Sequence, residues 1–273
     1  MKEVLLFLIF LFTSLFLIRY VYSISVDSVL LNVTNIDPGK SFEVKANVTE
    51  TLTALINDTN ITCVGPGGTE WNDSWDSYTL LNNSVSWNVI NTTTIEVTGI
   101  ITLNTSSING SWTCKVYARN TLGGSTFNSN SSLTVNTYVG LIIFENFCEF
   151  EAGLPGEENK NFTCEGKNHI TFMHDGNVNI SVKINGTNLV GTTDSTWEIG
   201  VGNITYKNVT SGSQAPSPPG IPLSTIESEL ISYWDRGIYP NKNTNDLYCW
   251  LNYPVPLKVQ TYQGTIYLIA REA

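Results

Sequence analysis

The sequence predicts an all-β protein made of two tandem β-sandwich domains behind an N-terminal signal peptide. Apolar and polar residues alternate with a period of two in many short segments, which is typical of half-buried strands. Gly, Pro, Asn and Asp bound these segments, and no amphipathic helix pattern appears beyond the first 23 residues. The predicted boundaries are residues 1–23 for the signal peptide, 24–137 for the first sandwich and 138–273 for the second.

The N-terminal segment has the three parts of an export signal. Lys2 precedes a nearly continuous apolar run over residues 4–18, and Val21-Tyr22-Ser23 fits a cleavage site after Ser23. An apolar run of this length is shorter than the roughly 20 residues that a membrane-spanning helix needs. We therefore favour cleavage, with a retained membrane anchor as the alternative, and expect an extracellular or cell-surface protein.

The composition narrows the class of partner. The chain has 41% apolar and only 14% charged residues, and Asn, Ser and Thr supply most of its polar side chains. Its net charge of −10 argues against a nucleic-acid partner, because phosphate binding requires a basic surface. Contact with a membrane is expected only through the N-terminal segment, if that segment is not cleaved.

In the first domain, about seven short strands fit a β-sandwich. The clearest alternation follows the turn at residues 37–40 and buries Phe42, Val44, Ala46 and Val48. A second alternating segment places Trp112 and Cys114 on one buried face. The expected strands cover residues 26–33, 42–48, 61–64, 85–90, 94–103 and 112–118, with a last strand ending near residue 135.

In the second domain, strands are again expected in short alternating segments. Asp175-Gly176-Asn177 predicts a hairpin turn, and the Pro-rich run 215–222 predicts a rigid loop. Residues 224–233 begin with a capping-box pattern, so a short helix and a strand are both open there. The expected strands cover residues 139–144, 169–173, 178–184, 197–201, 204–209, 247–251 and 265–270.

Five cysteines in an exported chain favour disulfides over a metal site, because no Cys-x2-Cys or Cys/His pair is present. Cys63 and Cys114 lie in the same predicted domain and form the favoured pair. For the other three, Cys148 with Cys164 leaves Cys249 free, and Cys164 with Cys249 leaves Cys148 free. The sequence does not decide between these two patterns.

Asn-x-Ser/Thr sequons, the acceptors of N-linked glycans, exceed chance about two-fold. The composition gives roughly six by chance, whereas the chain has fifteen. None follows Asn208, so the final 65 residues are expected to be shielded or to meet a partner. The candidate acceptors are Asn32, Asn47, Asn57, Asn60, Asn72, Asn82, Asn91, Asn104, Asn109, Asn130, Asn161, Asn179, Asn185, Asn203 and Asn208.

No constellation of residues points to catalysis. His169 and His174 are five positions apart on one predicted strand, so they point to opposite faces, and we expect both at the surface. Motifs for a nucleophilic serine, a zinc-binding helix and a phosphate-binding loop are missing from the sequence. We therefore expect a protein that is not an enzyme and needs no metal or cofactor.

Two tryptophans lie in a polar loop over residues 70–76. Trp71 and Trp75, flanked by carboxylates and amides, could stack on sugar rings. The alternative is that both cap the core of the first domain, because large exposed apolar side chains are unfavourable.

The turn Asp37-Pro38-Gly39-Lys40-Ser41 and the segment Gly110–Val116 resemble repeat modules of archaeal and bacterial cell-surface proteins, which are immunoglobulin-like β-sandwiches. The second half, through residues 169–171, 176–189 and 250–266, resembles another envelope β-sandwich. These resemblances imply an immunoglobulin-like first domain and an extracellular structural or adhesive role. They carry no catalytic residues.

The predicted function is thus a non-enzymatic secreted or cell-envelope glycoprotein with a structural or adhesive role, whose partners are envelope proteins or surface glycans. One alternative is a carbohydrate-binding module that uses Trp71 and Trp75. Another is a filament subunit that assembles by β-strand addition through the sequon-free strand 265–270.

Overall fold

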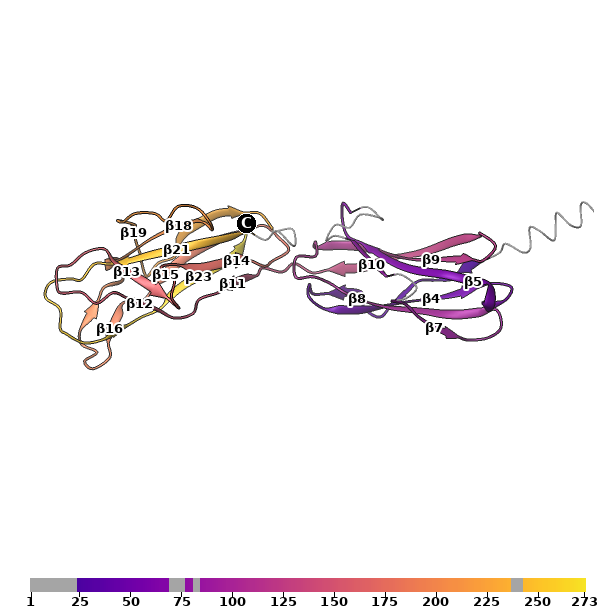
Figure 1. The fold of residues 1–273 in the computed structure, drawn as a ribbon, viewed down its shortest axis with the longest axis horizontal. Coiled ribbons are helices and arrows are strands. Elements are labelled where there is room, and N and C mark those ends of the chain that lie inside the picture. The colour runs from indigo at the N-terminus through magenta and orange to yellow at the C-terminus, as the bar shows by residue number, and fades with distance from the viewer. Residues whose placement is uncertain (1–23, 69–76, 81–83, 237–242) are drawn as a thin grey trace, which may run out of the picture. The chain divides into compact units, whose positions relative to one another are not determined.

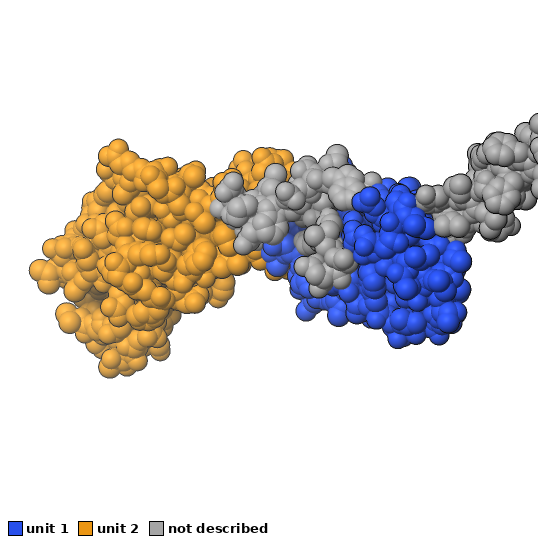
Figure 2. Space-filling view, turned by 45° about the vertical axis from the view of Figure 1, so that its right-hand side comes forward, with its two compact units in different colours: residues 1–137 blue, residues 138–273 orange. Residues whose placement is uncertain are grey.

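The computed structural model describes residues 24–68, 77–80, 84–236 and 243–273. The chain forms two compact units, Met1–Thr137 and Tyr138–Ala273 (Figure 2). Regular structure in the described residues is β-strand apart from two single 3₁₀ turns, η1 (Thr53–Leu55) and η2 (Val201–Asn203). Within these residues, no helix is both long enough and apolar enough to cross a membrane. The fold class is therefore all-β with several sheets, as predicted.

The first unit contains two five-stranded sheets whose inner faces share one apolar core (Figure 1). Sheet A has the order β1-β4-β8-β7, with β2 also paired to β4, and sheet B has the order β3-β10-β9-β5-β6. All pairs are antiparallel except β3 with β10. The strands are β1 (Ser25–Val26), β2 (Leu30–Leu31), β3 (Asn35–Ile36), β4 (Ser41–Thr49), β5 (Ile56–Val64), β6 (Ser77–Leu80), β7 (Ser86–Val89), β8 (Thr94–Thr102), β9 (Gly110–Asn120) and β10 (Ser125–Val135).

The single strand expected over residues 26–33 is wrong, because the chain there forms two separate short strands, β1 and β2, which both pair with β4 of sheet A. Between these strands the backbone carbonyls need other partners. Asn128 donates from Nδ2 to the carbonyl of Asp27 at 2.8 Å, and Asn130 donates from Nδ2 to the carbonyl of Val29 at 2.8 Å. Two amide side chains of β10 thus donate hydrogen bonds to the backbone carbonyls that lie between the short strands.

The centre of the first unit is fixed by Trp112, which is fully buried as predicted. Its indole Nε1 donates to the carbonyl of Ile108 at 2.8 Å, so the polar end of the ring is satisfied in the core. A Cβ at Gly65 would lie 2.7 Å from the Trp112 ring and 2.6 Å from Ile108. Only glycine therefore lets the backbone approach the indole this closely.

The second unit contains one seven-stranded sheet and two three-stranded sheets. In the large sheet, β21 pairs with β18 on one side and with β14 and then β13 on the other. Its strands are β11 (Leu141–Ile143), β12 (Cys148–Phe150), β13 (Lys160–Cys164), β14 (Ile170–His174), β18 (Ile204–Thr210), β19 (Ile221–Pro222) and β21 (Thr244–Leu251). The small sheets are β20 (Ser228–Trp234), β15 (Ile180–Gly186) and β23 (Ile266–Glu272), and β17 (Glu198–Ile199), β16 (Leu189–Gly191) and β22 (Tyr262–Gln263).

The hairpin predicted at residues 175–177 is wrong. The strands on either side, β14 and β15, belong to different sheets, so this segment is a crossover. Its backbone bonds instead to an upstream segment: Asp175 N–H donates to the carbonyl of Gly140 at 2.9 Å, and Asn177 N–H to the carbonyl of Tyr138 at 3.0 Å. In the 224–233 region, where a helix and a strand were both open, the chain forms strand β20.

The cysteines form two disulfides and leave one thiol. Cys63 pairs with Cys114, the favoured pair, and Cys148 pairs with Cys164. Each pair joins residues directly opposite each other on neighbouring strands. Cys249 is free and buried, and burial raises the pKa of its thiol. Two disulfides indicate an oxidising, extracytoplasmic environment.

Candidate functional site

The outer face of sheet B carries an exposed pair of aromatic rings. Tyr117 on β9 lies directly opposite Phe127 on β10, with ring centroids 5.3 Å apart and ring planes at 39°. The Nζ atom of Lys115 lies 4.8 Å from the centroid of the Phe127 ring, which is a cation–π distance. Phe127 remains 53% exposed. Period-two alternation explains the outward direction, because Val116 and Ala118 fill the inner face.

Open hollows border the Tyr117 ring on two sides. The larger, of about 320 Å³, is lined by Tyr117, Ser125, Thr126 and Phe127. The smaller, of about 150 Å³, is lined by Asp58, Thr59, Asn60, Tyr117, Ala118, Arg119 and Ser125. Aromatic faces beside an amide, a carboxylate and a guanidinium suit a ring with an apolar face and a polar rim.

The structure separates the sequons by exposure. Asn72 and Asn82 lie outside the described residues, and of the other thirteen none is fully buried. The exposed acceptors are Asn32, Asn57, Asn91 and Asn161, and the half-buried acceptors are Asn47, Asn60, Asn104, Asn109, Asn130, Asn179, Asn185, Asn203 and Asn208.

Four sequon amides already use the Nδ2 atom to which a glycan would be attached. Asn130 donates from it to Val29, and Asn179 donates to the hydroxyl of Tyr233 at 2.6 Å. The other two are Asn185, with the Thr225 carbonyl at 3.4 Å, and Asn203, with the Gly200 carbonyl at 3.1 Å. By contrast, Asn91 is exposed and its Oδ1 accepts from the backbone N–H and the hydroxyl of its own sequon threonine, Thr93. The turn lies between β7 and β8.

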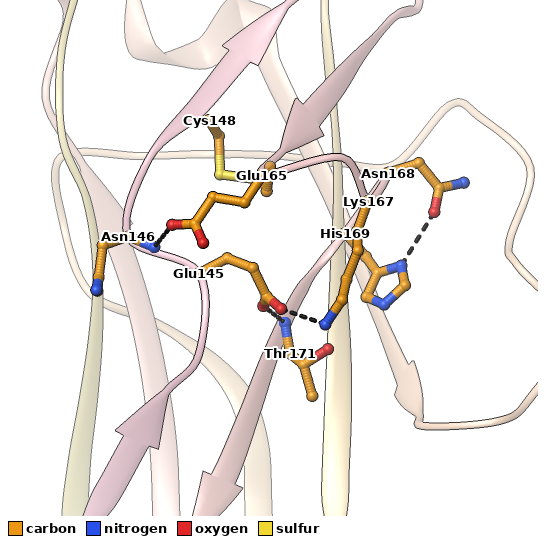
Figure 3. Close-up of a disulfide and its surroundings, with 9 residues drawn as sticks. Glu145, Asn146, Cys148, Glu165, Lys167, Asn168, His169 and Thr171 are labelled. Atoms are coloured by element: carbon orange, nitrogen blue, oxygen red, sulfur yellow. Dashed lines mark hydrogen bonds and ion pairs between the residues drawn. A yellow bond between two sulfur atoms is a disulfide. The ribbon is translucent and has the colours of Figure 1, made fainter.

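A buried carboxylate lies beside the second disulfide (Figure 3). Glu145 is 4% exposed and forms an ion pair with Lys167, while its Oε2 accepts from the backbone N–H of Thr171 at 2.6 Å. The hydrogen bond to Glu145 raises the pKa of the Lys167 ammonium. Next to it, Glu165 accepts from the backbone N–H of Asn146 at 3.2 Å. These contacts tie together the two loops that flank the bridge, and we assign them a structural role.

The two histidines have different surroundings. His169 is half-buried and its Nε2 lies 3.7 Å from Asp246 Oδ1, but Ser211 donates its hydroxyl to that same oxygen at 2.6 Å. The serine is therefore bonded to the carboxylate and not to the imidazole, so no nucleophilic triad forms. The surface position expected for His174 is wrong: it is 1% exposed, and its Nδ1 lies 3.0 Å from the Asp235 carbonyl oxygen. Among the described residues, no group of three or more His, Cys, Asp or Glu side chains could hold a metal.

Two further predicted features have different outcomes. Trp71 and Trp75 lie outside the described residues, so their role in sugar binding stays a prediction. The strand expected over residues 265–270 forms as β23 and pairs within its own unit, with seven residue pairs along β15. It lies at the edge of its three-stranded sheet.

The aromatic pair was not selected from the sequence, although its signal is present there. Tyr117 stands between Lys115 and Arg119 on the outward side of an alternating strand, and Phe127 is the one aromatic residue in a Ser- and Asn-rich strand. Their proximity depends on the register between β9 and β10, which the sequence does not state.

Comparisons with known proteins assign no family. No family model matches the chain, and no curated protein matches it. Among solved structures, a DUF4785 family protein from Legionella pneumophila is similar at 8% identity and a TM-score of 0.28, over 92% of this chain and 47% of that protein. A DUF4466 family protein from Parabacteroides merdae is similar at 9% identity and a TM-score of 0.28, over 85% of this chain and 99% of that protein. The chain thus spans about half the length of the Legionella protein, and similarity at this level says nothing of function.

Proposed function

We propose that the chain is a non-enzymatic glycoprotein of the cell envelope or the extracellular medium, with a structural or adhesive role. The observation that carries the proposal is the disulfide inside each unit, which joins directly opposed residues of neighbouring strands. Such bridges persist in oxidising compartments and make each sheet resistant to unfolding. A rigid unit of this kind can act as a spacer or present a binding surface, and neither role needs catalytic residues.

The outward faces of the strands support the same role. On β4, the outward-facing residues at the two ends of the strand meet hydroxyls across the sheet: Ser41 with Thr102 at 2.8 Å and Thr49 with Thr94 at 3.4 Å. Between them, the oppositely charged Glu43 and Lys45 pair with each other at 3.2 Å. A surface rich in hydroxyl and amide groups is hydrated through neutral polar groups. It also supplies acceptors for glycans.

The finer proposal is that the first unit is immunoglobulin-like. The strand orders β1-β4-β8-β7 and β3-β10-β9-β5-β6 correspond to the A-B-E-D and G-F-C-C′ sheets of that fold, with β3 as an A′ strand beside G. One feature departs from the antibody pattern: Cys63 and Cys114 join two strands of one sheet, whereas the antibody bridge joins the two sheets.

Cell fractionation and peptide mapping of the natively produced protein test the proposal. We expect the protein in the medium or on intact cells, where added protease digests it. We also expect both disulfides and glycan at a subset of sequons. A protein recovered from the cytoplasm with reduced cysteines would overturn the proposal. An N-terminus at Ile24 would establish cleavage, and an intact Met1 would establish the retained anchor.

Sequon occupancy gives a sharper test, because the structure divides the acceptors. We expect high occupancy at Asn91 and Asn161, which are exposed. We expect low occupancy in the secreted protein at Asn130 and Asn179, because a glycan attached there prevents or rearranges the hydrogen bond that Nδ2 makes in the folded unit. Site-by-site glycopeptide mass spectrometry measures both pairs in one sample, and equal occupancy would contradict the structural division.

A further inference from the structure

Three strands of sheet B bring Asn60, Tyr117 and Phe127 into one row on its outer face. Asn60 of β5 is the register partner of Tyr117 of β9, and Tyr117 is the register partner of Phe127 of β10. Directly opposed residues on one face have Cβ atoms about 5 Å apart, so Asn60 and Phe127 are the cross-strand neighbours of Tyr117.

The two sides of Tyr117 differ. Toward β10 the Phe127 ring packs against it, the Lys115 ammonium lies at the Phe127 ring, and the larger hollow borders both rings. On the other side is the smaller hollow, to whose lining Asn60, Asp58 and Arg119 contribute. The smaller hollow, which Tyr117 and Asn60 both line, is therefore rimmed by polar groups.

Asn60 is itself an acceptor, through the sequon Asn60-Ile61-Thr62. Among the residues that the structure describes, its side chain donates no hydrogen bond, and its buried Oδ1 has no hydrogen-bond partner. A buried acceptor without a donor costs free energy, so a hydroxyl or amide group seated in this hollow would be stabilised.

We propose that Asn60 carries an N-linked glycan whose first sugar lies in the smaller hollow, against the Tyr117 side chain. The apolar C–H face of the sugar covers the ring, and its hydroxyls meet Asp58 and Arg119 at the rim. The proposal rests on the proposed function, because it requires export and glycosylation. It adds to that function a binding position for one particular glycan, whose contacts with the protein would then stabilise the first unit.

The covalent step uses a phosphate-activated saccharide donor. The bond between Asn60 Nδ2 and the sugar C1 forms as the bond from C1 to the phosphate oxygen breaks, and the amide proton leaves with the phosphate. Thr62, whose hydroxyl belongs to the same sequon, is fully buried in the folded unit. Transfer therefore precedes the pairing of β5 with its neighbours.

A double-mutant cycle on the secreted, glycosylated full-length chain tests the proposal. The variants are Asn60→Gln, Tyr117→Ala and both together, and differential scanning fluorimetry measures the melting temperature of the first unit. We expect Tyr117→Ala to lower it by about 4 °C more in the glycosylated protein than in the Asn60→Gln background. Asn91→Gln is the matched control, because it removes a glycan far from the row in sequence and on a loop, and we expect no coupling to Tyr117.

Three readouts decide the outcome. Glycopeptide mass spectrometry that finds Asn60 unmodified overturns the proposal, and occupancy at other sequons in the same sample leaves the proposed function standing. Occupancy at Asn60 without coupling to Tyr117 also overturns it. Binding of the Asn60→Gln protein to a glycan array, abolished by Tyr117→Ala, would overturn it in favour of a saccharide from another molecule.

Discussion

The two disulfides join neighbouring strands in the same way but hold different parts of their units. Cys63 and Cys114 are fully buried on two strands inside sheet B and are 51 residues apart in the sequence. Cys148 and Cys164 are 16 residues apart, and Cys148 is half-buried on β12 at the end of its sheet. The first bridge therefore belongs to a core, and the second fixes an edge and its loop.

The surroundings of the bridges differ accordingly. The first lies among aliphatic side chains and Trp112 in one apolar cluster. The second lies beside the buried Glu145, which gathers Lys167 and the Thr171 backbone around it. Where packing is continuous, the bridge adds to it. At the edge, charge-assisted hydrogen bonds add to the packing of Cys164, which is fully buried in the apolar cluster of its own unit.

The largest expected effect comes from removing each bridge. We expect Cys63→Ala with Cys114→Ala to destabilise the first unit by about 4 kcal/mol, and Cys148→Ala with Cys164→Ala to destabilise the second by about 3 kcal/mol, because the longer loop loses more entropy when closed. Hydrogen–deuterium exchange with mass spectrometry, performed on the full chain in denaturant, resolves the units. Loss of protection throughout the first unit but only around β12 and β13 in the second is the expected pattern. Global loss in both would remove the distinction between core and edge.

An intermediate effect is expected from the buried glutamates, of which each unit offers one among the described residues. Glu50 is 1% exposed and accepts from Asn120 Nδ2 at 2.8 Å, a neutral donor, whereas Glu145 pairs with the Lys167 ammonium. We expect Glu145→Gln to cost about 2 kcal/mol and Glu50→Gln about 1 kcal/mol, because bonds between charged groups contribute more. Urea denaturation measures both. A larger loss of stability for Glu50→Gln than for Glu145→Gln would show that the ion pair of Glu145 is not what stabilises the edge of the second unit.

The smallest expected effect is a response to acid confined to the second unit. Hydrogen bonding to Lys258 at 2.7 Å, and then to Thr196, lowers the pKa of Asp194 from 3.8 to about 2. A carboxylate whose pKa is lower in the folded state adds stability that is present above about pH 4 and is lost as the pH falls toward 2. We expect the melting temperature of the second unit to fall across this window and Asp194→Asn to flatten the fall. If the melting temperature of the wild-type protein and that of Asp194→Asn depended on pH in the same way, the prediction would be wrong.

Local patterning predicted the central strands well. The alternation from Trp112 to Ala118 gives the buried face of β9, because a strand with neighbours on both sides has one inner and one outer face. The same rule would have placed Tyr117 outward. Prediction from local sequence failed where a segment pairs with residues that are distant in the chain. Asp175–Asn177 was expected to close a hairpin, but its backbone bonds to residues 138–140. His174, next to this segment, was expected at the surface, but it is buried.

The sequence by itself determined the all-β class, the favoured Cys63–Cys114 pair and the positions of the glycan acceptors, because strand periodicity, cysteine spacing and sequons are local properties. Only the tertiary structure decided between the two partners open to Cys164, divided the sequons into exposed and engaged amides, and aligned Asn60 with Tyr117 and Phe127. Those outcomes depend on register between strands that are far apart in the chain. Register is fixed by the sum of packing and hydrogen bonds over a whole sheet, which no local segment encodes.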